Sequence, residues 1–247
     1  MAARAATVID HISFGVCNIA QCIDYLEGEL GAVPCEIGPA GSFNWAQWAF
    51  AAQARIELIE PVGSAGFLQR FLAARGPGVH HVTWKVPSLA DAAARATALG
   101  YEVIGYDDRQ PSWKECFLHP KQALGVVIQM AEAHPELGVA PAEPMPFPCR
   151  VEPRPEPAHV HSLVMNAPEP GAVLRLFEQL LHGTLEREPD GLMFRWPDSP
   201  HRILVQLDAA RAAGVKEVRL QSSRKLGLPP ADLLGTPIVQ VATNTGG

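Results

Sequence analysis

The chain has 247 residues and a formal net charge of −6, with 47% hydrophobic and 19% charged residues. A chain of this length supports one large hydrophobic core or two small domains joined by a linker. The acidic balance, without a cluster of Lys and Arg, argues against nucleic acid or an anionic membrane surface as the main partner. No apolar run approaches the roughly 20 residues that span a bilayer, and the first seven residues lack the pattern of a secretion signal. We therefore expect a cytoplasmic globular protein whose partner is a small molecule.

A unit of about seventy residues recurs along the chain. The first copy opens with an apolar, β-favouring strand at residues 8–16, and a helical pattern at 19–30 follows and ends at Gly31. Three more strands are predicted near residues 33–37, 44–51 and 55–60. This copy therefore has the order β-α-β-β-β.

The second copy has the same order. Its elements are a strand at residues 79–86, a helix at 89–99 and strands near 101–106, 113–118 and 125–130. His11 and His81 lie 70 positions apart, and Glu57 and Gln129 lie 72 positions apart. The predicted fold class is therefore α+β, with tandem βαβββ modules that form a half-open mixed β barrel.

A proline-rich segment follows these two copies. Residues 135–157 contain eight prolines, which favour an extended connector over a helix or a central strand. A third copy is predicted beyond it, with a strand at residues 159–165, a helix at 171–181 and strands at 184–188, 192–196 and 202–207. A fourth copy is partial, because residues 218–221 and 238–241 supply strands without a full set of elements.

Four matching polar residues point to a metal site. Alternate side chains of a strand share a face, and the first and last strands of each copy would bring His11, Glu57, His81 and Gln129 to the concave face of the barrel. Two imidazoles, a carboxylate and an amide suit one divalent ion of Zn, Fe, Mn, Co or Ni.

Taken singly, each of these residues has a structural explanation. A lone histidine is more often structural, Glu57 would pair with Arg55 or Lys85, and the Gln129 amide would satisfy a backbone group. The repeat favours the metal, because four ligand-type residues at matched places need one explanation instead of four coincidences.

These residues resemble motifs of the vicinal oxygen chelate superfamily, which includes glyoxalase I, epimerases, extradiol dioxygenases and resistance proteins. The resemblance is closest to the methylmalonyl-CoA epimerase-like branch and covers residues 7–132. The motifs that carry it are Ile9-Asp10-His11-Ile12, Ile56-Glu57-Leu58-Ile59-Glu60-Pro61, Gly78-Val79-His80-His81-Val82, and Phe117-Leu118-His119-Pro120-Lys121 before Gly125-Val126-Val127-Ile128-Gln129.

The resemblance implies that His11, Glu57, His81 and Gln129 hold the metal, while His80 faces away. It divides the chain into a vicinal oxygen chelate domain with the metal site at residues 1–134, a linker at 135–157 and a degenerate domain of the same type at 158–247. In this last domain His161 falls where His11 does, but Leu204 takes the place of Glu57. We therefore expect no metal there, and the degenerate domain would cover the barrel or form a homodimer surface.

Two departures bear on the chemistry. The last ligand is usually glutamate in the epimerase branch and is Gln129 here, and a glutamate proposed as a base aligns with Gln47. Because an amide cannot accept a proton near neutral pH, methylmalonyl-CoA epimerase activity itself is disfavoured. Glu57 and Lys114, taken as the counterpart of Gln47 in the second copy, are the candidate catalytic residues. The candidate substrate-binding residues are Gln47, Trp48 and Trp113.

Three functions follow as alternatives. The first is a metal-dependent isomerase, epimerase or lyase that binds a carbonyl or thioester through two oxygens and forms an enolate-like intermediate. The second is an iron-dependent dioxygenase, because two histidines and a carboxylate also form the facial triad used for oxygen activation. The third is a binding or resistance protein with aromatic pocket walls and no turnover.

Overall fold

The computed structural model describes residues 6–138 and 152–242. They form two compact units whose segments alternate along the chain. The His11 unit contains His11–His80, Ala142–Ser162 and Glu217–Gly247, and the His81 unit contains Met1–Asp10, His81–Pro141 and Leu163–Lys216. The serial division at the proline-rich segment stays a prediction, and most of that segment, residues 139–151, lies outside the described residues.

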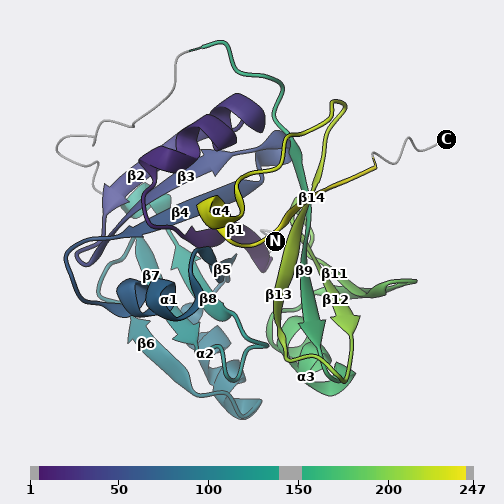
Figure 1. Cartoon of the computed structure of the whole chain (residues 1–247). Helices are drawn as coiled ribbons and strands as arrows, with labels where there is room; N and C mark the ends of the chain where they lie inside the picture. The colour runs from purple at the N-terminus through teal and green to yellow at the C-terminus, as the bar shows by residue number, and fades with distance from the viewer. Residues whose placement is uncertain (1–5, 139–151, 243–247) are drawn as a thin grey trace. The chain divides into compact units, whose positions relative to one another are not determined.

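The first βαβββ copy forms four adjacent strands (Figure 1). Strands β2, β3 and β4 are antiparallel neighbours, and β1 runs parallel to β4. The predicted helix at 19–30 is a 3-10 turn, Ala20–Cys22, followed by a π-helix, Asp24–Glu29. The strands are β1 Val8–Gly15, β2 Val33–Pro39, β3 Phe43–Ala49 and β4 Arg55–Pro61, with a 3-10 turn at Ala51–Gln53 before β4.

A helix that the repeat did not predict follows β4. Helix α1, Phe67–Arg75, ends at Gly76, and Leu68 is fully buried. It packs against β1 at Gly15, where a Cβ atom would lie 2.9 Å from the Phe71 ring and 3.0 Å from Leu68. Gly15 shares the strand face of His11, because side chains two and four residues apart point the same way. Helix α1 therefore covers one end of that face.

The second copy has the predicted elements (Figure 1). Its strands lie in the order β5-β8-β7-β6, with β5 parallel to β8. Ser88 caps the helix by accepting a hydrogen bond from the Asp91 amide, and the helix buries Leu89, Ala92 and Ala96. The elements are β5 Gly78–Lys85, α2 Leu89–Ala98, β6 Val103–Asp107, β7 Trp113–Leu118 and β8 Val127–Ala133, followed by a 3-10 turn at Pro135–Leu137.

The third copy is also present, and the fourth is partial. Strands β10, β11, β12 and β9 lie side by side in that order, and β13 pairs in parallel with β14. The third copy consists of β9 His159–Ala167, α3 Pro170–Leu174, a π-helix at Arg175–Leu180, β10 Thr184–Glu188, β11 Gly191–Arg195 and β12 Arg202–Leu207. The partial copy consists of β13 Gly214–Gln221, α4 Ala231–Leu234 and β14 Ile238–Val241.

The α+β class with tandem βαβββ modules is confirmed, since the strands form one eight-stranded and one six-stranded mixed sheet. The core of the His81 unit contains an aromatic group in which Trp84 lies 5.6 Å from Trp196 and 6.1 Å from Phe177, measured between ring centroids. Among the described residues no helix has the length and apolar character needed to cross a membrane.

Candidate metal centre

Three of the four residues marked by the repeat come together. One ligand atom from each of His11, Glu57 and His81 lies within 4.8 Å of the others, and all three residues are buried. Two imidazoles and one carboxylate are nitrogen and oxygen donors that suit a divalent transition metal. A buried carboxylate is costly unless it is paired or binds a cation, so this donor set fits a metal ion.

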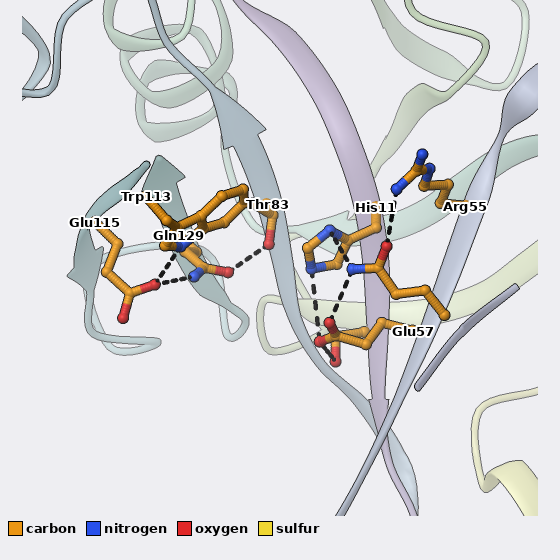
Figure 2. A network of polar contacts seen from close by, with 9 residues as sticks. His11, Arg55, Glu57, Thr83, Trp113, Glu115 and Gln129 are labelled. Atoms are coloured by element: carbon orange, nitrogen blue, oxygen red, sulfur yellow. Dashed lines mark hydrogen bonds and ion pairs between the residues drawn. The ribbon is translucent and has the colours of Figure 1, made fainter. Parts of the chain in front are cut away.

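The strand register explains why Glu57 faces His11. Ser13 pairs with Glu57 between the parallel strands β1 and β4, and His11 shares the face of Ser13. The fully buried Ser13 hydroxyl donates to Glu57 Oε1 at 2.9 Å, and His11 Nε2 lies 3.6 Å from the same oxygen. Figure 2 shows His11 and Glu57 pointing toward one another.

Gln47 completes the surroundings of this carboxylate. It pairs directly with Glu57 across β3 and β4, and its Nε2 donates to Glu57 Oε2 at 3.0 Å. Arg55 Nη1 donates to Gln47 Oε1 at 3.2 Å, which fixes the end of the amide that faces Glu57. Gln47 is 6% exposed, and its Nε2 also lies 3.5 Å from His11 Nδ1. Its substrate-binding role stays a prediction.

The fourth marked residue, Gln129, has both ends of its amide in hydrogen bonds (Figure 2). Thr83 Oγ1 donates to Gln129 Oε1 at 2.5 Å, and Gln129 Nε2 donates to Glu115 Oε2 at 2.7 Å. Trp113 Nε1 donates to the same Glu115 oxygen at 2.8 Å. The metal role of Gln129 stays a prediction, and an amide oxygen that accepts one hydrogen bond keeps a second lone pair for a cation.

Sequence reasoning missed Glu115. The register places it on the face of Gln129, because Phe117 pairs with Gln129 and Glu115 lies two residues from Phe117 on β7. The corresponding position of the first copy is Trp45, which pairs with Ile59. A search for ligand-type residues at matching places therefore passes over Glu115.

Lys114 lies on the opposite face of β7. It pairs with Glu132, and its ammonium lies 2.7 Å from Glu132 Oε1, near the start of α2, where the Leu89 amide also donates to Glu132. Phe117, not Lys114, occupies the register of Gln47, so the alignment of Lys114 with Gln47 was wrong. The catalytic role of Lys114 stays a prediction.

The two tryptophans expected at the substrate differ in position. Trp48 is fully buried on the face of β3 opposite Gln47, and its Nε1 donates to Glu27 Oε1 at 3.0 Å. It therefore packs in the core, and its substrate-binding role stays a prediction. Trp113 is half-buried on the Gln129 face, with Lys85 Nζ 6.0 Å from its ring centroid.

His80 faces away from His81, as alternate residues of a strand do. Its ring lies 5.3 Å from Phe67 and 4.9 Å from Phe71 between centroids. Burial among these rings lowers the pKa of His80 to about 4, which keeps its imidazole neutral near neutral pH.

Comparisons with known proteins agree with this arrangement. Residues 10–117 match the family described as the Glyoxalase/Bleomycin resistance protein/Dioxygenase superfamily. The uncharacterized protein YqjC of Bacillus subtilis (strain 168) is 27% identical over 131 residues, which are 50% of this chain and 91% of that protein.

Solved structures extend the likeness. Methylmalonyl-CoA epimerase from Mycobacterium tuberculosis has a TM-score of 0.50 and 25% identity, over 56% of this chain and 95% of its own. A mutant of 4-hydroxymandelate synthase from Streptomyces coelicolor has a TM-score of 0.59 and 9% identity, over 89% of this chain and 72% of its own. The second likeness is one of fold alone, and its coverage extends beyond the first two copies.

Proposed function

Because residues 10–117 match the Glyoxalase/Bleomycin resistance protein/Dioxygenase superfamily, we propose that the chain is a divalent-metal-dependent enzyme that binds its substrate through two oxygen atoms. The observation that supports the proposal is the buried group of His11, Glu57 and His81, whose ligand atoms lie within 4.8 Å of one another. A buried carboxylate is costly without a positive partner, and a cation held between Glu57 and the two imidazoles would supply one.

In this proposal His11, Glu57, His81 and Gln129 hold one ion of Zn, Fe, Mn, Co or Ni. The bound ion supplies Lewis-acid stabilisation of negative charge on substrate oxygens. Ser13 and Gln47 orient the Glu57 carboxylate before substrate arrives, because they donate hydrogen bonds to its two oxygens at 2.9 and 3.0 Å.

The reaction class that we propose is isomerisation, epimerisation or elimination through an enolate-like intermediate of a carbonyl or thioester. Glu57 is the proposed proton acceptor, since it is the carboxylate of the group, and it would leave the ion to take up the proton. Gln47 and Trp113 are the proposed substrate contacts. The Mycobacterium tuberculosis structure named as a methylmalonyl-CoA epimerase supports this class. Gln47 cannot act as a second base, because its amide does not accept a proton near neutral pH. This favours a reaction that needs one proton acceptor.

Metal content and hydrogen exchange test the proposal. The protein is purified without oxygen, its metals are measured, and methylmalonyl-CoA is incubated with it in D2O as a probe carbon acid. We expect about one divalent ion per chain, deuterium at the substrate α-carbon, and loss of both in Glu57→Ala. The control is Glu188→Ala, which removes an exposed carboxylate from β10. A wild-type protein that holds no divalent metal after supplementation would refute the proposal.

A dioxygenase is the second candidate, because two histidines and one carboxylate also form the ligand set of non-haem iron oxygenases. Bound Fe²⁺ with oxygen consumption would favour it. Activity with Co²⁺, Mn²⁺ or Ni²⁺ without oxygen would exclude it. If neither metal nor turnover is found, the third alternative, a small-molecule binding or resistance protein, is favoured.

A further inference from the structure

The two modules carry the same polar pair in opposite orders. In the first module, the glutamine on the third strand, Gln47, donates to the glutamate on the last strand, Glu57, at 3.0 Å. In the second module, the glutamine on the last strand, Gln129, donates to the glutamate on the third strand, Glu115, at 2.7 Å. Each module therefore has one amide–carboxylate pair, with the carboxylate on a different strand.

We propose that Glu115 is a positioning residue that orients Gln129 and strengthens its amide oxygen as a metal donor. This inference rests on the proposed function, because it assigns Glu115 a task toward the same metal. Glu115 need not touch the ion or the substrate; it acts through the Gln129 amide.

The hydrogen bonds set the orientation of this amide. A primary amide has one accepting end and one donating end, so the carboxylate of Glu115 selects the NH2 group and directs the carbonyl oxygen away from itself. The hydroxyl of Thr83, which is fully buried, holds that oxygen at 2.5 Å. The amide is therefore fixed from both ends.

The charge of Glu115 also affects the donor strength of Gln129. A hydrogen bond to a carboxylate is charge-assisted, and hydrogen bonds in a chain polarise one another, so electron density on the amide oxygen increases. Residues that accept a hydrogen bond from a metal ligand commonly raise the basicity of that ligand. Gln129 is a neutral ligand, but its hydrogen bond to the Glu115 carboxylate makes its oxygen more negative. The oxygen therefore attracts the cation more strongly, although less strongly than a glutamate bound directly to the metal would.

Glu115 is itself held in place. Its Oε2 accepts from both Gln129 and Trp113, at 2.7 and 2.8 Å, and its side chain is half-buried. Because the Glu115 side chain is already held by Trp113, it loses less conformational entropy when it accepts the hydrogen bond from Gln129. Trp113 therefore supports this geometry, in addition to any contact with substrate.

Cobalt binding by the metal-free full-length protein tests the proposal. Isothermal titration gives the Kd for Co²⁺, and the visible absorption of bound Co²⁺ reports on its ligands. We expect Glu115→Gln to weaken Co²⁺ binding by about tenfold to a hundredfold, the range found for residues behind metal ligands, and to alter the cobalt spectrum while the melting temperature stays close to that of the wild type. Asp108→Asn removes an exposed carboxylate from the same module and should leave the Kd unchanged.

A swapped pair provides the second variant. Glu115→Gln combined with Gln129→Glu restores one amide–carboxylate bond with the charge on β8, and we expect it to bind Co²⁺ more tightly than Glu115→Gln alone. The inference is wrong if Glu115→Gln binds Co²⁺ within twofold of the wild type, or if the swap binds no better than the single variant. Absence of Co²⁺ binding by the wild type would instead overturn the proposed function, and this inference with it.

Discussion

Gln47 and Glu57 face each other across the antiparallel strands β3 and β4, and the Gln47 amide donates to the Glu57 carboxylate at 3.0 Å. Arg55 holds the other end of the amide at 3.2 Å. Gln47, which aligns with the proposed base of an epimerase, thus donates a hydrogen bond to Glu57, a ligand of the proposed metal site. Its amide supplies a hydrogen bond that a second carboxylate at this position would replace with repulsion.

Gln47→Leu tests this relationship. Leucine keeps much of the volume of glutamine but donates no hydrogen bond, so Glu57 loses a partner on Oε2. We expect the Kd for Co²⁺ to rise about tenfold or more, as for other residues behind metal ligands. The matched control is Asn44→Leu, which removes an amide–carboxylate bond of 3.1 Å to Glu60 from the same two strands on their opposite face. Equal effects of the two variants would show that the loss is structural.

A buried ion pair stabilises the first module. Glu27 on the π-helix is fully buried, and Arg154 Nη2 lies 3.0 Å from Glu27 Oε2, while Trp48 donates to Glu27 Oε1. Removal of one partner of such a pair leaves a buried charge uncompensated, and we expect Arg154→Ala to lower the free energy of unfolding by about 3 kcal/mol. Urea denaturation measures it.

The control for this pair is Arg211→Ala, because Arg211 forms an exposed ion pair with Asp208 and such pairs contribute little. A loss in Arg154→Ala no larger than that of Arg211→Ala would contradict the assignment. Glu27→Gln combined with Arg154→Met should recover part of the stability, because no unpaired charge then remains.

The repeat made the strands predictable, but it did not fix which face each side chain occupies. Lys114 and Gln47 were matched at an offset of 67 residues, whereas the register matches Gln47 with Phe117 at an offset of 70. An odd error in offset moves a strand side chain to the other face. The sequence therefore placed Lys114 on the correct strand but did not establish on which face of the sheet its side chain lies.

Helix α1 and Glu115 could not be predicted from the repeat, because neither has a counterpart in another copy. Helix α1 lies between the first and second copies, and its apolar positions, Phe67, Leu68, Phe71 and Leu72, have the spacing of a helix face but no counterpart elsewhere. Glu115 was missed because a tryptophan occupies its place in the first copy. The matched positions indicated the buried group of His11, Glu57 and His81, whereas the residues that surround this group differ between the modules.

The group around Glu132 predicts a pH dependence of stability. Hydrogen bonds from Lys114 and the Leu89 amide lower the pKa of Glu132 to about 2. A carboxyl group whose pKa falls on folding stabilises the protein above its unfolded value of about 4.5, and that contribution is lost as the pH falls from there toward 2. Solvent screens this pair in part, so Glu132→Gln should cost about 1 kcal/mol at pH 7 and progressively less below pH 4.5.

Denaturation of the wild type and Glu132→Gln at several pH values between 3 and 7 checks this expectation. Glu188→Gln serves as the control, because Glu188 is exposed and its replacement should produce no such pH-dependent difference. A cost of Glu132→Gln that stays constant down to pH 3 would show that the carboxylate is not stabilised in this way.

The sequence predicted that His161 matches His11 and that Leu204 matches Glu57, but Ser13 pairs with Glu57 and Val164 pairs with Leu204, so Ser162, not His161, takes the position of His11. His11 and His161 therefore lie on the first strands of their copies but on opposite faces, and a comparison of the two tests metal-linked stability. His11 lies 3.6 Å from Glu57, whereas His161 lies on β9, whose partner strand β12 offers Ile203, Leu204 and Val205 in register. A ligand that binds only the folded protein stabilises it by about 2.7 kcal/mol at a hundred times its Kd. We expect Co²⁺ to raise the melting temperature of the wild type and of His161→Ala, and not that of His11→Ala. Equal cobalt responses of the two variants would place the cation elsewhere, since the donor group found among the described residues contains His11, Glu57 and His81.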